Sequence, residues 1–210
     1  MAYLSWCSRR GNRVGGATLA HARRSADPYF RDLYFVGRGL DIGAGGDPLT
    51  LPPDTYPRAE EVARWDYDTH GDAQYLTPET AGGTYDYVHA SHVLEHVHDP
   101  GIAVRAWLGV VRPSGHLVIL VPEYTLYERR IWPPHVNTDH KTTWVMGPDR
   151  GGADEWWPAR LAEDCADIAI LVRAQLLAYG WRGDLPDKQD QTVNPGVECA
   201  IEMVLRKRCG

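Results

Sequence analysis

Short apolar runs, each followed by a turn rich in glycine or proline, recur through residues 39–121. Residues 39–42 form one run before a glycine-rich turn, and residues 61–66 form another that ends in an acid. Residues 84–90 alternate in character, which is typical of a strand. The stretch from His116 to Val121 is almost continuously apolar, as expected of a strand that is covered on both faces. Each run therefore predicts a strand.

Two helices and two more strands complete the predicted pattern. Residues 28–37 predict a short helix, because Asp27 can cap it and Pro28 fits its first turn. Residues 99–111 predict a second helix with one apolar side, followed by a turn over residues 112–115. Residues 168–177 and 197–206 predict an antiparallel hairpin at one edge of the sheet. The alternation of strands and helices favours an α/β sandwich with a mainly parallel sheet.

A glycine-rich motif follows the first predicted strand and reads Asp41-Ile42-Gly43-Ala44-Gly45-Gly46. Glycines allow a sharp turn and let a ligand approach the main chain. Alone, this pattern is a weak indicator of a nucleotide site. Asp66 strengthens it, because an acid at the end of the next strand can bind both hydroxyls of a ribose. In parallel sheets the ligand lies beyond the carboxyl ends of the strands.

Four more segments follow in order: Gly71-Asp72-Ala73, Tyr85-Asp86-Tyr87-Val88, Leu94-Glu95-His96-Val97 and residues 111–119. With the glycine motif, they resemble the class I S-adenosylmethionine-dependent methyltransferases over residues 39–121. Residues 71–76, 90–96 and 139–141 resemble a compact bacterial group of type 11-like members. The resemblance implies a three-layer Rossmann-like sandwich whose mainly parallel seven-stranded sheet has an antiparallel edge strand. It divides the chain into an N-terminal arm and helix, residues 1–38, and one methyltransferase domain, residues 39–210.

The resemblance also implies S-adenosylmethionine as cofactor. Asp41 would orient the glycine-rich turn, Asp66 would bind the ribose with Asp68 as a competitor, and Asp72 would face the adenine amine. The implied cofactor-binding set is Asp41, Gly43, Ala44, Gly45, Asp66, Asp72, Ala73, Ala90 and Ser91. The chain departs from the family where Ser114 replaces a glycine. It also departs in having only five residues between Asp66 and Asp72, too few for the usual second helix.

Histidines gather around the fourth family motif, at positions 89, 92, 96 and 98. The segment from His92 to His96 matches a zinc-peptidase pattern, but it lies inside the methyltransferase block and no other peptidase element accompanies it. The block also resembles O-methyltransferases in which acids and histidines hold a divalent ion. The implied metal set is His92, Glu95, His96 and His140. The alternative is that these residues shape the site without a metal.

The acceptor chemistry directs attention to bases after the fifth strand. A hydroxyl needs a base or a metal, because its pKa lies far above 7, whereas an amine needs only a neutral lone pair. The candidate catalytic residues are His140, Asp139, His96 and His135. Residues 123–144 are rich in aromatic side chains and lie where this family builds its acceptor pocket. Residues 154–157 are a candidate lid, or alternatively part of an ordinary packed loop.

The net charge of −6 is unevenly divided. Residues 1–38 carry about +5 and the remainder about −11. An acidic body disfavours binding to a nucleic-acid backbone and suits a polar or cationic small molecule. No apolar run approaches the roughly 18 residues of a membrane span. The N-terminal segment has no signal-peptide run, and the four scattered cysteines fit a reducing compartment, so a cytoplasmic protein is expected. Its expected oligomeric state is a monomer or homodimer.

These observations predict an N- or O-methyltransferase that modifies a hydroxyl or amine of a small molecule, such as a sugar, aminosugar or other secondary metabolite. The rival hypothesis is an RNA or protein methyltransferase that docks through the basic arm, and deleting residues 1–26 would separate the two. A third is a methyltransferase-like fold without chemistry, which would fail to bind S-adenosylhomocysteine.

Overall fold

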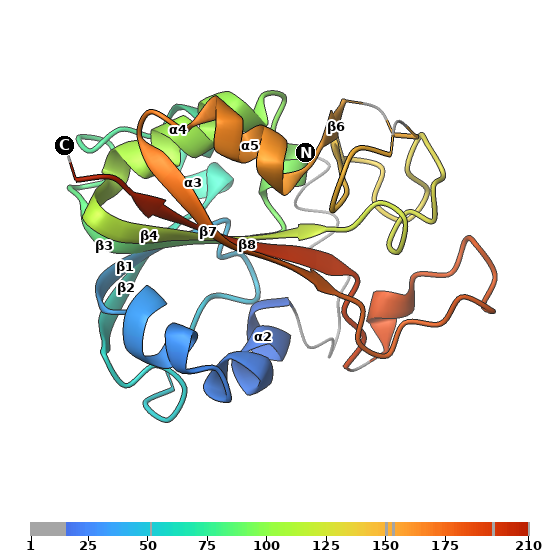
Figure 1. Cartoon of the computed structure of the whole chain (residues 1–210), viewed down its shortest axis with the longest axis horizontal. Coiled ribbons are helices and arrows are strands. Elements are labelled where there is room, and N and C mark those ends of the chain that lie inside the picture. Colours follow the sequence, from blue (N-terminus) through green and yellow to red (C-terminus); the bar gives the residue numbers. More distant parts are fainter. Residues whose placement is uncertain (1–15, 51, 150, 153, 195, 210) are drawn as a thin grey trace.

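A twisted six-stranded sheet, in the order β2-β1-β3-β4-β8-β7, forms the middle layer of the chain. The computed structural model describes residues 16–209 apart from residues 51, 150, 153 and 195. Helices α4 and α5 cover one face of the sheet, and α2 with the π-helical turn η1 covers the other (Figure 1). The predicted three-layer α/β sandwich is therefore confirmed.

The elements follow the apolar runs of the sequence. The large sheet contains β1 (Gly37–Ile42), β2 (Ala59–Trp65), β3 (Tyr85–Ser91), β4 (Val111–Pro122), β7 (Ala169–Leu177) and β8 (Ala200–Lys207). The helices on its faces are α2 (Gly16–Ser25), η1 (Phe30–Tyr34), α4 (Pro100–Val110) and α5 (Pro158–Asp164). Shorter elements are α3 (Tyr67–His70), η2 (Ala73–Tyr75), η3 (Leu94–His96), η4 (Gln191–Val193) and the parallel pair β5 (Thr143–Trp144) and β6 (Glu155–Trp156).

One detail of the predicted sheet is wrong, namely the number of strands. In the described residues the large sheet has six strands rather than seven, because the five residues between Asp66 and Asp72 leave no room for a further strand and helix. Gly71-Asp72-Ala73 leads instead into η2. The antiparallel pair predicted at one edge of the sheet is confirmed, because β8 runs antiparallel to β4 and the edge strand β7 runs antiparallel to β8.

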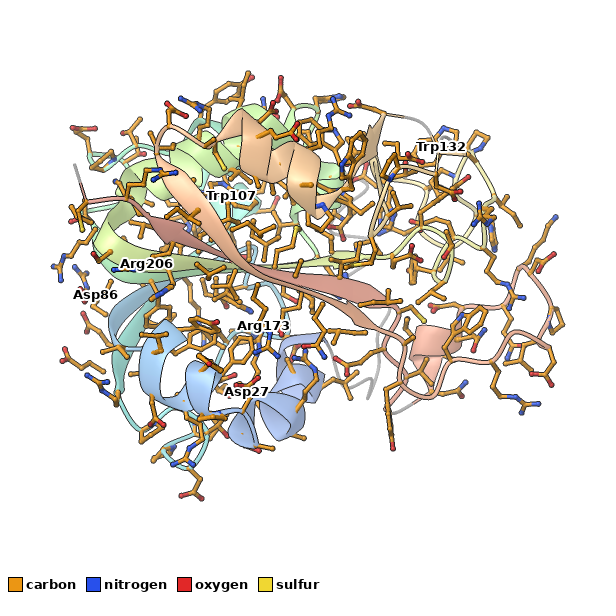
Figure 2. All side chains as sticks on the ribbon, in the orientation of Figure 1. Asp27, Asp86, Trp107, Trp132, Arg173 and Arg206 are labelled. Atoms are coloured by element: carbon orange, nitrogen blue, oxygen red, sulfur yellow. The ribbon has the colours of Figure 1, made fainter. Side chains whose placement is uncertain are left out.

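The core lies between the sheet and α4. Trp107 of α4 is fully buried, and its indole Nε1 donates to the carbonyl of Ala73 at 2.9 Å (Figure 2). The turn predicted over residues 112–115 is instead a bulge within β4, where the register against β3 shifts and Ser114 adopts φ 65°. Ser114 thus carries the left-handed conformation that a glycine adopts at lower cost.

The opposite layer begins with α2. Asp27 accepts a hydrogen bond from the backbone N–H of Tyr29 at 2.9 Å, which confirms its predicted capping role, although the helical turns end at Tyr34 instead of continuing to residue 37. Asp27 also pairs with Arg173 of β7 at 2.6 Å (Figure 2). Among the described residues, no helix is both long and apolar enough to cross a membrane.

Candidate functional site

The loop of residues 43–50, here called the glycine loop, follows β1 at the carboxyl edge of the sheet. Gly43 and Gly45 have φ 69° and 46°, a region that glycine adopts readily. The Gly43 N–H donates to the carbonyl of Trp65 at 2.7 Å, and the Gly45 N–H donates to Oδ1 of Asp66 at 2.8 Å. The loop is thereby tied to the end of β2.

Asp41 lies beneath the glycine loop and is 2% exposed. Its Oδ2 accepts a hydrogen bond from the Leu49 N–H at 2.7 Å, and its Oδ1 lies 2.7 Å from Nδ1 of His89 on β3. Asp41 therefore holds the far end of the loop, which is the geometry expected of a residue that orients it.

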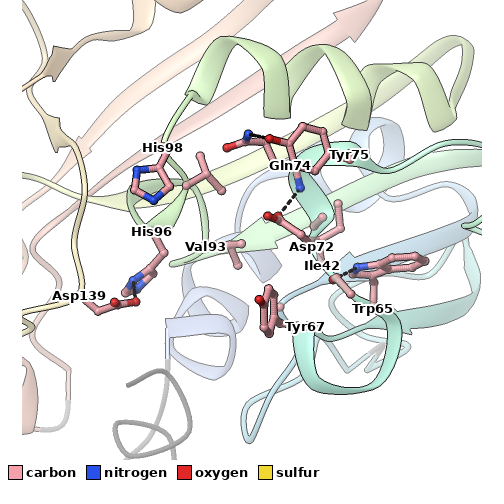
Figure 3. A pocket seen from close by; sticks show the side chains of 14 residues that line it. Ile42, Trp65, Tyr67, Asp72, Gln74, Tyr75, Val93, His96, His98 and Asp139 are labelled. Atoms are coloured by element: carbon pink, nitrogen blue, oxygen red, sulfur yellow. Dashed lines mark hydrogen bonds and ion pairs between the residues drawn. The ribbon is translucent and has the colours of Figure 1, made fainter. Parts of the chain in front are cut away.

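A cavity of about 340 Å³ opens beside this loop (Figure 3). Three residues of the implied cofactor set line it, namely Gly43, Asp72 and Ala73. Asp72 is fixed by the N–H of Gln74, which donates to Oδ1 at 2.9 Å. Aromatic side chains that sequence reasoning missed add further walls, and they are Trp65, Tyr67 and Tyr75. Their position next to the two predicted acids was the available signal.

The other members of the implied cofactor set do not line the cavity, and neither does Asp68, the competitor for the ribose role. The carboxylate of Asp66 is turned to the Gly45 N–H, and Asp68 is exposed on the first turn of α3. Ala90 is fully buried near the end of β3, and Ser91 is that strand's last residue. The ribose role therefore remains a prediction for both acids.

The same cavity reaches His96 and Asp139 on its far wall (Figure 3). Nδ1 of His96 lies 3.1 Å from Oδ2 of Asp139, and Nζ of Lys141 donates to Oδ1 at 2.8 Å. The hydrogen bond with His96 holds the pKa of Asp139 well below its usual range, and Lys141 adds to this effect. Burial alone would lower the pKa of His96, but the bond to Asp139 and the charge of Glu95 raise it.

Behind this wall, three potential ligands converge, with donor atoms of Glu95, His96 and His140 within 4.8 Å of one another. Oε1 of Glu95 lies 3.8 Å from Nε2 of His96 and 3.9 Å from Nε2 of His140. Oε2 of Glu95 is buried without a hydrogen-bond partner. Burial favours the neutral acid, yet the contact with His92 and the charges of the nearby histidines lower the pKa of Glu95.

Backbone hydrogen bonds bring these distant segments together. The N–H groups of Lys141 and Thr142 donate to the carbonyl of Glu95 at 2.8 and 3.3 Å. His140 is then held from behind by Glu128, whose Oε1 lies 2.5 Å from Nδ1 of the histidine. Sequence reasoning missed Glu128, because nothing in the residues 123–144 distinguishes it from the other acids.

Comparisons with known proteins agree with this geometry. A family model described as a methyltransferase domain matches residues 16–164. This chain belongs to the class I methyltransferase family. The family assignment confirms the resemblance drawn from the motifs, and the cofactor named for two structural relatives is consistent with S-adenosylmethionine as methyl donor.

Solved structures share the fold of this methyltransferase at low sequence identity. The N-methyltransferase NodS from Bradyrhizobium japonicum, in complex with S-adenosyl-L-homocysteine, aligns with a TM-score of 0.57 and 13% identity over 99% of both chains. An S-adenosylmethionine-dependent methyltransferase from Clostridium acetobutylicum aligns with 0.54 and 10% over 90% of this chain and 92% of that one. The mitomycin 7-O-methyltransferase MmcR aligns with 0.52 and 13% over 99% and 61%. No curated protein matches the chain.

Several residues of this methyltransferase lie apart from the predicted cluster. His92 contributes Nδ1 at 3.5 Å from Oε1 of Glu95, but its nitrogens do not join the group of three within 4.8 Å. His135 is also outside that group, and both its ring nitrogens are buried without hydrogen-bond partners. The predicted lid is wrong for Trp156, which stacks on Trp144 at 5.9 Å in the main core. These two tryptophans form the packed loop that was the alternative.

Proposed function

We propose that this methyltransferase transfers a methyl group from S-adenosylmethionine to a hydroxyl or amine of a polar small molecule. One observation carries the proposal. A single cavity joins the cofactor-side residues Gly43, Asp72 and Ala73 to His96 and Asp139. Methyl transfer from a sulfonium needs the acceptor atom in line with the methyl carbon, about 3 Å away. A shared cavity of this kind can hold donor and acceptor in that relation.

We further propose that Glu95, His96 and His140 hold a divalent metal ion. Metal bonds of about 2.0–2.2 Å place neighbouring ligand atoms about 3.5 Å apart. The 3.8 and 3.9 Å from Oε1 of Glu95 to the two histidine Nε2 atoms are close to that spacing. The buried, unpartnered Oε2 of Glu95 is a second feature that a cation would satisfy. The donor set therefore fits a metal.

The next layer of contacts supports the same proposal. Each histidine has a carboxylate on its Nδ1, which is Asp139 for His96 and Glu128 for His140. Metal-bound histidines commonly have such partners, which fix the ring and its tautomer. A bound divalent ion would lower the pKa of an acceptor hydroxyl. Without an ion, His140 or His96 remains the candidate base for the acceptor.

The charge of the site supports a small, polar or cationic acceptor. Glu95, Glu128 and Asp139 face the cluster, and Lys141 is paired with Asp139. The names of two structural relatives, an N-methyltransferase and a mitomycin 7-O-methyltransferase, are consistent with either acceptor atom on this fold. We place the enzyme in the cytoplasm, as a monomer or homodimer.

The basic arm supports macromolecular docking less than its composition suggests. Arg23 and Arg24 both bind Glu202, and Arg38 pairs with Glu61 at 2.6 Å. Arg9, Arg10 and Arg13 lie outside the described residues. Deleting residues 1–26 would remove Arg24 from a buried ion pair, so the informative deletion ends at residue 15. Activity on small molecules that survives this deletion would argue against a docking role.

The test of the proposed function is an acceptor screen with S-adenosylmethionine. Amines, aminosugars, sugars and catechols are each offered to the enzyme, and methylated products are detected by mass spectrometry. Each reaction is run on protein treated with a chelator and then supplied with zinc, manganese or magnesium. We expect turnover of one acceptor class that the chelator abolishes and one metal restores. Turnover that the chelator leaves unchanged would contradict the proposed metal site. A histidine would then be the candidate base.

A further inference from the structure

A continuous chain of buried charged and polar side chains runs from helix α2 to the glycine loop. Arg24 of α2 is fully buried, and its Nε and Nη2 donate to Oε2 of Glu202 on β8 at 2.9 and 2.7 Å. Its Nη1 lies 3.4 Å from Nε2 of His89, which is also fully buried. Nδ1 of His89 then meets Oδ1 of Asp41 at 2.7 Å. The carboxylate of Asp41 ends the chain by accepting from the Leu49 N–H.

The proton positions in this chain are fixed by its first member. A guanidinium group has only donors, so Nε2 of His89 must accept from Arg24 with its lone pair. The imidazole proton must then sit on Nδ1, where it is donated to Oδ1 of Asp41. Arg24 thereby selects the tautomer of His89 that can bind a carboxylate. With Oδ1 held in this way, Oδ2 of Asp41 points to the Leu49 N–H.

A second connection joins the same two elements. His21 of α2 contacts the hydroxyl of Thr50 through Nε2 and the hydroxyl of Tyr56 through Nδ1, both at 2.9 Å. Thr50 directly follows Leu49, so α2 is connected to the far end of the glycine loop at two successive residues, directly at Thr50 and through His89 and Asp41 at Leu49. Gly43, at the near end of that loop, lines the cofactor cavity.

We infer that Arg24 and His89 are positioning residues for S-adenosylmethionine. They act through Asp41, which holds the glycine loop in the conformation that the cofactor binds, and α2 is consequently part of the cofactor site. The sequence motif predicted a role in orienting this loop for Asp41 alone. The inference concerns the cofactor side and is independent of the acceptor and metal proposals.

The test measures the dissociation constant of S-adenosylhomocysteine by calorimetry on full-length variants. His89→Gln places its amide at the position of Nε2 and loses the bond to Asp41, whereas His89→Asn places its amide nitrogen at the position of Nδ1 and keeps it. We expect His89→Gln to bind on the order of 10-fold more weakly, since it leaves a buried carboxylate oxygen without its donor. His89→Asn should stay within about 3-fold of the wild type. The matched control is His116→Asn, which alters a buried histidine of β4 far from the loop and should leave affinity unchanged.

Hydrogen exchange distinguishes a local effect on the glycine loop from a general loss of stability. In His89→Gln the amides of residues 43–50 should exchange faster while those of α4 keep their protection. Equal losses of affinity in His89→Gln and His89→Asn, or full affinity in His89→Gln, would overturn the inference. If His89→Gln does not fold, Thr50→Val decides. This variant removes one exposed hydroxyl, and we expect it to weaken binding by about 3-fold at an unchanged melting temperature. Unchanged affinity in Thr50→Val would then overturn the inference that α2 is part of the cofactor site.

Discussion

Two buried groups of charged side chains lie under the carboxyl half of the sheet, and they differ in how completely their members are bonded. The first group, centred on Arg24, Glu202 and His89, has close contacts of 2.6–3.4 Å throughout. The second group, centred on Glu95, His96 and His140, has internal separations of 3.8 and 3.9 Å and leaves Oε2 of Glu95 without a partner. The first group is thus hydrogen-bonded within the protein throughout, whereas the second has a buried carboxylate oxygen that the proposed metal ion would satisfy.

The two groups contain one buried carboxylate each whose hydrogen-bond partners differ, namely Glu202 and Glu95. Burying a carboxylate costs free energy unless hydrogen bonds and opposite charges offset the lost solvation. Glu202 has such partners in Arg23 and Arg24. Glu95 has His92 at 3.5 Å and two further histidines at 3.8 and 3.9 Å on Oε1, but its Oε2 has no partner, so its burial is a cost that a bound cation would offset. We therefore expect variants of the first group to lose stability, and cofactor affinity where they release the glycine loop, whereas variants of the second group should lose activity.

The largest effect is expected for Glu95→Gln. Turnover should fall by about 10³-fold or more, because the proposed ligand for the ion is lost. The free energy of unfolding should stay the same or rise, since an incompletely solvated charge is removed. Steady-state kinetics and thermal unfolding of the same preparation check both parts. A variant that is destabilised but catalytically normal would place Glu95 with the scaffold group instead.

Arg24→Met should have the next largest effect, now on stability. It leaves Glu202 buried with Arg23 as its remaining charged partner, and a broken buried pair costs about 3–5 kcal/mol. The matched control is Arg105→Met, which breaks the exposed bidentate pair with Asp167 and should cost about 0–1 kcal/mol. Urea denaturation measures both. Equal losses of unfolding free energy in the two variants would mean that the buried pair stabilises the protein no more than the exposed pair.

Glu128→Gln tests the contact that holds His140 in the group of Glu95, His96 and His140. The loss of the carboxylate on Nδ1 of His140 should lower kcat by about 10–100-fold. Glu123→Gln is the control, because Glu123 is a buried acid of the same segment that bonds Thr125 and Leu126 instead. Its activity should stay within about 2-fold. If both variants retain full activity, His140 does not depend on Glu128.

The last predicted effect concerns the pH dependence of the free energy of unfolding, through His116, which lies outside both groups. Burial, with the charge of Arg206, lowers the pKa of His116 from 6.5 to about 4. A lowered pKa means that the unfolded chain binds the proton first, so this contribution is present above about pH 6.5 and is lost as the pH falls through 4. His116→Asn should remove about 2–3 kcal/mol of the pH dependence between these values. Unfolding curves from pH 7 to pH 4 that are parallel for the two proteins would contradict this account.

The sequence allowed the fold to be predicted further than the site. Apolar runs and the glycine motif located the six strands, because backbone periodicity is local information. The number of strands was wrong because a family expectation was preferred over the short distance from Asp66 to Asp72. Glu95, His96 and His140 were predicted from motifs, but Glu128 and Arg24 could not be. Their roles arise from contacts between segments that only the folded chain brings together.

The most direct test of the account is a crystal structure with S-adenosylhomocysteine and a divalent metal, with anomalous scattering data recorded at the metal edge. We expect the cofactor product in the cavity beside Gly43 and Asp72, with its sulfur towards His96. We also expect an anomalous peak bound by Glu95, His96 and His140. S-adenosylhomocysteine in this cavity with no anomalous peak, and with Oε2 of Glu95 bonded to protein or water, would contradict the central claim.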